Sequence, residues 1–136
     1  MARQEPRFPG RRLVAMIHLD LIRQHGGSPG LRDEGLLESA LARPAMRFAY
    51  EAKADLADLA ASLAYGLAKN HPFVDGNKRV ALALLFTFLG MNDRELAASE
   101  RDAVTTILAV ASGKLDETGF ADWIRQHSKT APRAAR

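Results

Sequence analysis

The chain has 136 residues, no cysteine and a formal net charge of +3 at pH 7. This length predicts a single domain over residues 1–136, large enough to form a hydrophobic core without disulfides or structural metals. The lack of cysteine is typical of a reducing cytosol, and it excludes disulfide scaffolds, thiol catalysis and cysteine-ligated zinc.

Many of the cations lie near the two ends of the chain. They are Arg3, Arg7, Arg11 and Arg12 at the start, and Arg125, Lys129, Arg133 and Arg136 at the end. Such basic ends are compatible with nucleic-acid contact. Because the cations are not interleaved with aromatic residues and no nucleic-acid-binding motif is present, solvated basic tails are the favoured interpretation. We therefore expect no direct nucleic-acid binding.

The longest apolar run, residues 80–86, is far shorter than a membrane span. The beginning of the sequence also lacks the apolar segment of a signal peptide. These features predict a cytoplasmic protein that does not insert into membranes.

Helix-forming residues dominate the sequence and alternating strand patterns are nearly absent, which predicts an all-α fold. The first helix is expected over residues 13–25, where apolar residues recur every four positions, and Gly26 and Gly27 end it. His18 and His25 lie seven residues apart on one face of this helix. They could form a metal-binding pair, but solvated histidines are the favoured interpretation.

A second helix is expected from a cap at Asp33 to about residue 43, with Pro44 ending it. Residues 44–54 show no strong periodicity, which predicts a loop or a short hairpin. The exposed backbone of such a segment could receive a peptide partner. Phe48 and Tyr50 are therefore candidate residues for docking a protein target.

Four further helices complete a predicted six-helix fold. The third covers residues 56–70 after a cap at Asp55, and the fourth covers residues 77–89. The fifth starts near Ser99, and the sixth starts near Thr118 and carries Phe120, Trp123 and Ile124 inward. The fourth helix is apolar on nearly every face, so we expect it to be buried at the centre of the fold.

The sequence HPFVDGNKR, residues 71–79, joins the third and fourth predicted helices. Pro72 disfavours helical backbone at His71, which places His71 at the carboxyl end of the third helix. Phe73 is expected to anchor the segment in the core. Asp75 and Gly76 form a turn, and Asn77 is expected to be the N-cap of the fourth helix.

The charged groups of this segment predict a phosphate site. A helix N-terminus offers unpaired N–H groups and the positive end of a dipole, and Lys78 and Arg79 add two cations there. Asp75 could hold Mg²⁺ whose other ligands come from phosphates and water. His71 is the nearby residue that can accept a proton at neutral pH. Together these groups describe the transfer of a phosphate-containing group to a hydroxyl.

Two points remain open from the residues alone. A helix C-terminus favours the imidazolium form of His71, which cannot act as a base, whereas the nearby cations oppose that form. The segment could also be a capped turn with solvated charges, although six such groups crowded before a buried helix make that interpretation the weaker one.

Residues 71–79 resemble the Fic/Doc signature, His-x-Phe-x-(Asp/Glu)-(Ala/Gly)-Asn-(Gly/Lys)-Arg, at all seven defined positions. Residues 30–33 and 37–41 with Pro44 resemble the upstream segment of Doc-type (death-on-curing) toxins, and residues 64–70 resemble their approach to the motif. The resemblance covers about residues 11–127. It implies a compact all-helical fold.

The resemblance also implies roles for individual residues. His71 would be the general base, Asp75 would hold Mg²⁺, and the phosphates of ATP would be bound by Gly76, Asn77, Lys78 and Arg79. AMP-transferring members carry glycine where this chain has Lys78. The lysine therefore implies a Doc-type kinase that transfers the γ-phosphate of ATP to a threonine of elongation factor Tu, arrests translation and is neutralised by a small antitoxin.

The chain departs from the Doc pattern at Gly76, where alanine is common, and at Val80, where threonine is common. Gly76 keeps the loop roomy, so AMP transfer to a protein hydroxyl stays an alternative. An inactive helical module that only binds a protein partner is a second alternative.

Overall fold

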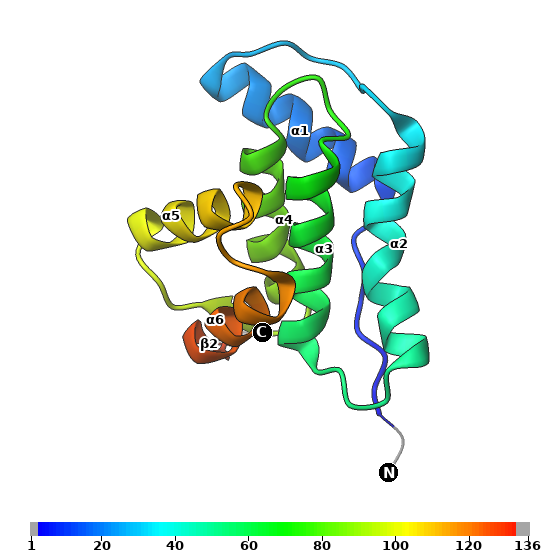
Figure 1. Cartoon of the computed structure of the whole chain (residues 1–136), viewed down its shortest axis with the longest axis vertical. Helices are drawn as coiled ribbons and strands as arrows, with labels where there is room; N and C mark the ends of the chain where they lie inside the picture. Colours follow the sequence, from blue (N-terminus) through cyan, green and yellow to red (C-terminus); the bar gives the residue numbers. More distant parts are fainter. Residues whose placement is uncertain (1–2, 133–136) are drawn as a thin grey trace.

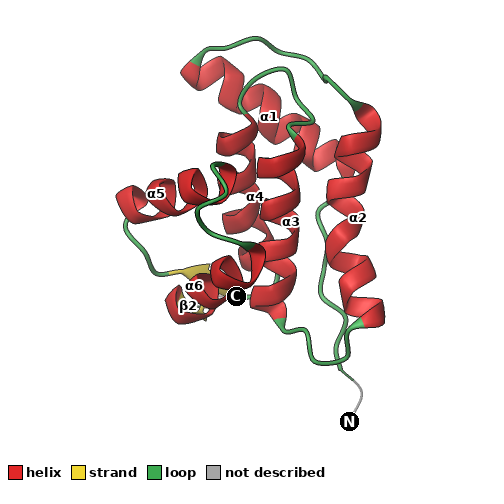
Figure 2. Ribbon diagram, viewed as in Figure 1, coloured by secondary structure: helices red, strands yellow, loops and turns green. Residues whose placement is uncertain are grey.

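The computed structural model describes residues 3–132, which form six helices and two short strands (Figures 1 and 2). The helices are α1 (Arg11–His25), α2 (Glu34–Tyr50), α3 (Leu56–Asn70), α4 (Asn77–Met91), α5 (Glu100–Ala111) and α6 (Glu117–His127), and the strands are β1 (Arg94–Leu96) and β2 (Ser128–Thr130). The predicted all-α class is confirmed. None of the helices in this part of the chain has the length and apolar character needed to cross a bilayer.

Helix α3 lies at the centre of the molecule and contacts α2, α4, α5 and α6 (Figure 1). Its many alanines let these neighbours approach closely, and Ala60, Ala61 and Ala64 are fully buried. Gly66 has the same effect, since a Cβ atom there would lie 2.7 Å from Cδ of Arg43 on α2. The helix that leads into residues 71–76 is therefore held on several sides.

Helix α2 continues through Pro44 to Tyr50, so the predicted end at residue 43 and the predicted loop or hairpin over residues 44–54 are wrong. A proline inside a helix removes one backbone hydrogen bond and costs about 3 kcal/mol. Packing against α3 over its length offsets this local cost, and Pro44 itself is buried. Irregular backbone is confined to residues 51–55.

Helix α4 is packed in the core as predicted, with Val80, Leu84 and Phe88 fully buried. Its burial is less complete than its sequence suggests, because Phe86 is 41% exposed. The alanine-rich α3 is buried at more positions than α4, since small side chains let neighbours cover more of a helix. Helix α4 therefore forms one side of the core and is not buried on all of its faces.

The amino-terminal segment folds back on the helices, which differs from the predicted solvated tail. The guanidinium of Arg3 donates hydrogen bonds to the carbonyl oxygens of Glu51 and Ala54, each at 3.0 Å. Phe8 stacks on Phe88 of α4, with ring centroids 5.9 Å apart. At the other end of the chain, the predicted tail residues Arg133 and Arg136 lie outside the described residues.

Strands β1 and β2 pair antiparallel, with Arg94 opposite Thr130 and Leu96 opposite Ser128. Each strand has three residues, which is too short for an alternating pattern to predict it. The pair joins the segment after α4 to the segment after α6, and it closes the end of the molecule away from residues 71–76 (Figure 2).

Ion pairs connect α6 to its neighbours. Glu117 pairs with Arg43 and Arg47 of α2, and Arg125 pairs with Asp55 and Asp58 at the start of α3. A hydrogen bond from Arg125 is the main cause that lowers the pKa of Asp55 to about 2. Asp55 also caps α3 as predicted, because its carboxylate accepts the Asp58 N–H.

Candidate active site

We call residues 71–76 the motif loop. His71 follows the last turn of α3 as predicted, and its backbone adopts the left-handed conformation, with φ 50° and ψ 56°. A non-glycine residue rarely adopts this conformation, and Asp93 is the other example among residues 3–132. The buried Pro72 then directs the chain out of the helix. The regular helical backbone of α3 therefore ends at His71, the first residue of the motif loop.

The motif loop pairs with the segment between α1 and α2. Pro72 accepts hydrogen bonds at its carbonyl from the N–H groups of Arg32 (2.8 Å) and Asp33 (3.0 Å). Val74 donates to the Gly30 carbonyl at 3.1 Å, and Phe73 is 4% exposed. The predicted role of Phe73 as the apolar anchor is confirmed, and the backbone pairing fixes the loop on its other side.

The side chain of Arg32 caps the end of α3. Its Nε donates to the His71 carbonyl at 2.6 Å, and its Nη2 donates to the Asn70 carbonyl at 2.8 Å. These carbonyls have no partner inside the helix, and a cation is favourable at the negative end of the helix dipole. Sequence reasoning assigned no role to Arg32, because 39 residues separate it from His71 and no local pattern joins them.

Asn77 is not the N-cap of α4, which corrects the prediction. Gly76 takes that position with φ 79°, and no side chain caps the helix. The Asn77 side chain instead spans the motif loop: its Oδ1 accepts from the Phe73 N–H and its Nδ2 donates to the Phe73 carbonyl, both at 2.9 Å. Because the amide is used inside the loop, the first-turn N–H groups of α4 are left for an anion.

His18 on α1 lies beneath the motif loop and is 5% exposed, so the prediction that it is solvated is wrong. Its ring stacks on Phe73, with centroids 3.9 Å apart, and its Nε2 lies 2.9 Å from the Asp75 carbonyl oxygen. A carbonyl can only accept, so Nε2 is the donor. This contact also argues against the metal pair with His25, whose side chain is exposed on the same helix.

The carboxylate of Asp75 is oriented by backbone N–H groups. Oδ1 accepts from Gly76 at 2.9 Å and Oδ2 accepts from Ser28 at 3.3 Å. Gly27, at φ 112°, leaves the space that this arrangement requires, since a Cβ atom there would lie 2.7 Å from Asp75 Oδ2. Each carboxylate oxygen keeps a further lone pair for a cation. Within residues 3–132 no three His, Asp or Glu side chains gather as a metal site, so an ion at Asp75 would need ligands from phosphates and water.

A cleft of about 630 Å³ opens beside these groups. One wall carries the predicted site residues: His71, Asp75, Gly76, Asn77, Lys78 and Arg79. The other wall is apolar and comes from Leu82 of α4 and from Val104, Ile107 and Leu108 of α5. The volume suits a nucleotide-sized ligand, and the two walls match the phosphates and the base of such a ligand.

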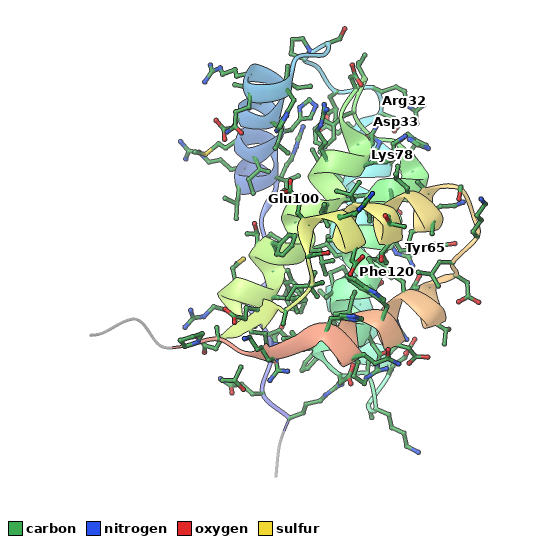
Figure 3. All side chains as sticks on the ribbon, turned by 90° about the vertical axis from the view of Figure 1, so that its left-hand side faces the viewer. Arg32, Asp33, Tyr65, Lys78, Glu100 and Phe120 are labelled. Atoms are coloured by element: carbon green, nitrogen blue, oxygen red, sulfur yellow. The ribbon has the colours of Figure 1, made fainter. Side chains whose placement is uncertain are left out.

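A second hollow of about 570 Å³ adjoins the cleft and shares His71, Lys78 and Leu108 with it. Thr105, Ser112 and Lys114 line its remaining sides. Figure 3 shows Lys78 at the same end of the molecule as Arg32 and Asp33, above α5. Because His71 and Lys78 line both the cleft and the second hollow, each can contact a ligand in either space, as a reaction between two substrates requires.

Phe48 and Tyr50 lie on the last turn of α2, at the end of that helix away from the motif loop (Figure 1). Phe48 is half-buried beneath the guanidinium of Arg3, 3.9 Å from the ring centroid, whereas Tyr50 is 83% exposed. Neither residue lines the cleft or the second hollow. The loop on which their docking role was based is absent, and the docking of a target there stays a prediction.

Comparison with known proteins adds a family context to this geometry. The family model described as Fic/DOC family matches residues 10–89. The protein kinase doc of Escherichia phage P1 is 35% identical over 84% of this chain and 89% of its own length. The toxin Doc of Mycolicibacterium smegmatis is 50% identical over 54% of this chain, and that match spans 57% of the relative.

Proposed function

Because the chain belongs to the Fic/Doc family, we propose that it is a Doc-type toxin kinase that transfers the γ-phosphate of ATP to a hydroxyl of a protein. The expected acceptor is a threonine of a translation factor such as elongation factor Tu, so the reaction would arrest translation. The observation that carries the proposal is Lys78, which lines the cleft together with His71 and Arg79.

The cleft supports a division of roles among its residues. Lys78, Arg79 and the N–H groups at the start of α4 bind phosphate oxygens, and Gly76 lets the backbone come close to them. Asn77 contributes to phosphate binding indirectly, because its side chain hydrogen-bonds to the Phe73 backbone and keeps the motif loop in place. The apolar side chains of α5 accept the base of the nucleotide. Mg²⁺ held at Asp75 would neutralise charge on the phosphates when it is bound.

His71 serves as the general base in this scheme. The acceptor hydroxyl gives its proton to the imidazole as its oxygen bonds to the γ-phosphorus. The bond from that phosphorus to the bridging oxygen breaks, and ADP leaves. The second hollow gives the acceptor side chain a route to His71 that the nucleotide does not block, because His71 lines both spaces.

AMP transfer is the competing activity, and Gly76 is the residue that favours it. The two activities differ in which phosphate is transferred. The lysine at position 78 crowds the space that AMP transfer needs for the phosphates beyond the one transferred, and it therefore favours the kinase. The purified protein should be incubated with translation factors and ATP labelled at either the α- or the γ-phosphate. Label from the γ-position supports the kinase, and label from the α-position replaces it with AMP transfer. A folded protein that transfers neither label is a binding module.

Expression in bacteria tests the toxin role. His71→Ala should abolish growth arrest, while His25→Ala, which changes an exposed histidine outside both hollows, should remain toxic. Full toxicity of His71→Ala would remove His71 as the base. The proposed partner is a small antitoxin, and co-expression of a short open reading frame adjacent to the gene should restore growth.

A further inference from the structure

The conformation of His71 requires support from its surroundings. Left-handed backbone at a residue other than glycine is unfavourable, and such residues persist where neighbouring groups determine them. His71 is exposed, so core packing of its own side chain does not supply this support. Pro72 disfavours helical backbone at His71 but leaves extended conformations open.

The guanidinium of Arg32 supplies the missing constraint. Its two donors reach two successive carbonyls, Asn70 at 2.8 Å and His71 at 2.6 Å, so the planar group holds the peptide units on both sides of the His71 Cα atom. Extended backbone at His71 would redirect its carbonyl away from one donor. A guanidinium holds two acceptors in a fixed geometry, whereas a lysine ammonium is a single mobile point charge.

We propose that Arg32 is a positioning residue that acts through His71: it holds the His71 backbone in the left-handed conformation and thereby directs the imidazole at the junction of the cleft and the second hollow. This inference rests on the proposed function, in which His71 is the base. It assigns Arg32 no contact with ATP or with the acceptor, since Arg32 lines neither space.

Loss of the Arg32 side chain should leave the fold intact. Arg32 is exposed, and exposed polar contacts contribute little to global stability. The backbone bonds from Arg32 and Asp33 to the Pro72 carbonyl do not depend on the side chain and would persist in a variant. Leu31 and Phe73 would also keep their bridge between the two segments. The effect of the substitution should therefore concentrate at His71.

Kinetics of label transfer test the proposal with three variants. Arg32→Ala should lower kcat by about tenfold to a hundredfold, which is typical of a displaced catalytic group, and leave the KM for ATP unchanged. Arg32→Lys should recover little of kcat, because lysine keeps the positive charge but not the two N–H donors in a fixed plane. Arg125→Ala, which removes an exposed arginine that makes several hydrogen bonds away from the cleft, should retain kcat.

Chemical rescue distinguishes positioning from general destabilisation. Guanidinium chloride at a few millimolar should restore part of the kcat of Arg32→Ala, because the exposed site is accessible to it, while equal sodium chloride should not. Arg32→Lys with full kcat, or a rise in the KM for ATP as the main effect of Arg32→Ala, would overturn the proposal.

A spectroscopic measurement separates this inference from the proposed function. In ¹⁵N,¹³C-labelled protein, the backbone resonances of residues 70–73 should shift or broaden in Arg32→Ala and stay unchanged in Arg125→Ala. Unchanged His71 resonances in Arg32→Ala would refute the positioning role whatever the activity. A wild-type protein that transfers no label, with His71 resonances that do respond to Arg32→Ala, would refute the proposed function while leaving the positioning role intact.

Discussion

Replacing Gly27 by alanine tests the orientation of Asp75 directly. The added Cβ atom would lie 2.7 Å from Asp75 Oδ2, closer than a methyl group can approach, and at a tight 3.2 Å from Asp75 Cγ. The carboxylate must therefore move, which breaks its hydrogen bond from the Ser28 N–H. We expect weaker Mg²⁺-dependent binding of ATP, since the carboxylate proposed to hold the ion is displaced.

Gly26→Ala is a matched control for this substitution. Gly26 also has a positive φ, 81°, but no atom lies within 4 Å of the position of its Cβ. Both variants thus strain the backbone after α1, each by about 1–3 kcal/mol. For a chain of this length that strain lowers Tm by roughly 3–12 °C, since about 1 kcal/mol corresponds to a few degrees.

The assay compares thermal unfolding with calorimetric titration of ATP, in the presence and absence of Mg²⁺. Both variants should lose stability, whereas the Mg²⁺-dependent part of ATP affinity should fall in Gly27→Ala and remain in Gly26→Ala. Equal affinities in the two variants would show that the position of the Asp75 carboxylate does not matter for the bound nucleotide.

Three further predictions concern other parts of the molecule. His18→Phe keeps an aromatic ring against the motif loop but leaves the Asp75 carbonyl without its donor, so urea unfolding should show a loss of about 1–3 kcal/mol. Unchanged stability would mean that water replaces the donor. The pKa of Asp55 lies near 2, below its ordinary 3.8, so its pair with Arg125 stabilises the fold above about pH 4, and that contribution is lost as the pH falls toward 2. Because both groups are partly exposed, the loss should be a few tenths to about 1 kcal/mol, and Arg125→Ala should remove it; an identical acid transition in that variant would contradict the assignment. Tyr50→Ala should impair modification of a protein target more than binding of ATP if targets dock on the last turn of α2, and equal loss of both would end that idea.

Local sequence predicted the features that local chemistry controls. The helix limits around residues 56–70, the Asp55 cap and the exit of the chain at Pro72 all follow from short-range rules of capping and proline geometry, and the structure confirms them. The residues that line the charged wall of the cleft could be predicted because they are contiguous in the chain, between residues 71 and 79.

The structure overrode local rules where distant packing outweighed them. Pro44 favours a helix end, yet α2 continues because burial against α3 offsets the lost hydrogen bond. Asn77 is a good N-cap by residue type, yet its amide bonds to the Phe73 backbone because the motif loop folds back over it. In both places the local preference is worth less than the contacts that compete with it.

By itself the sequence determined which groups stand at the junction of α3 and α4: a histidine after a helix, a carboxylate in a turn, and two cations at the start of a buried helix. Only the tertiary structure decided how those groups are held. His18, Gly27 and Arg32 come from α1 and the segment after it, 38 to 57 residues away from the motif-loop and α3 atoms that they contact. Their roles exist because chain folding brings the two segments together, and no spacing rule within one segment contains that information.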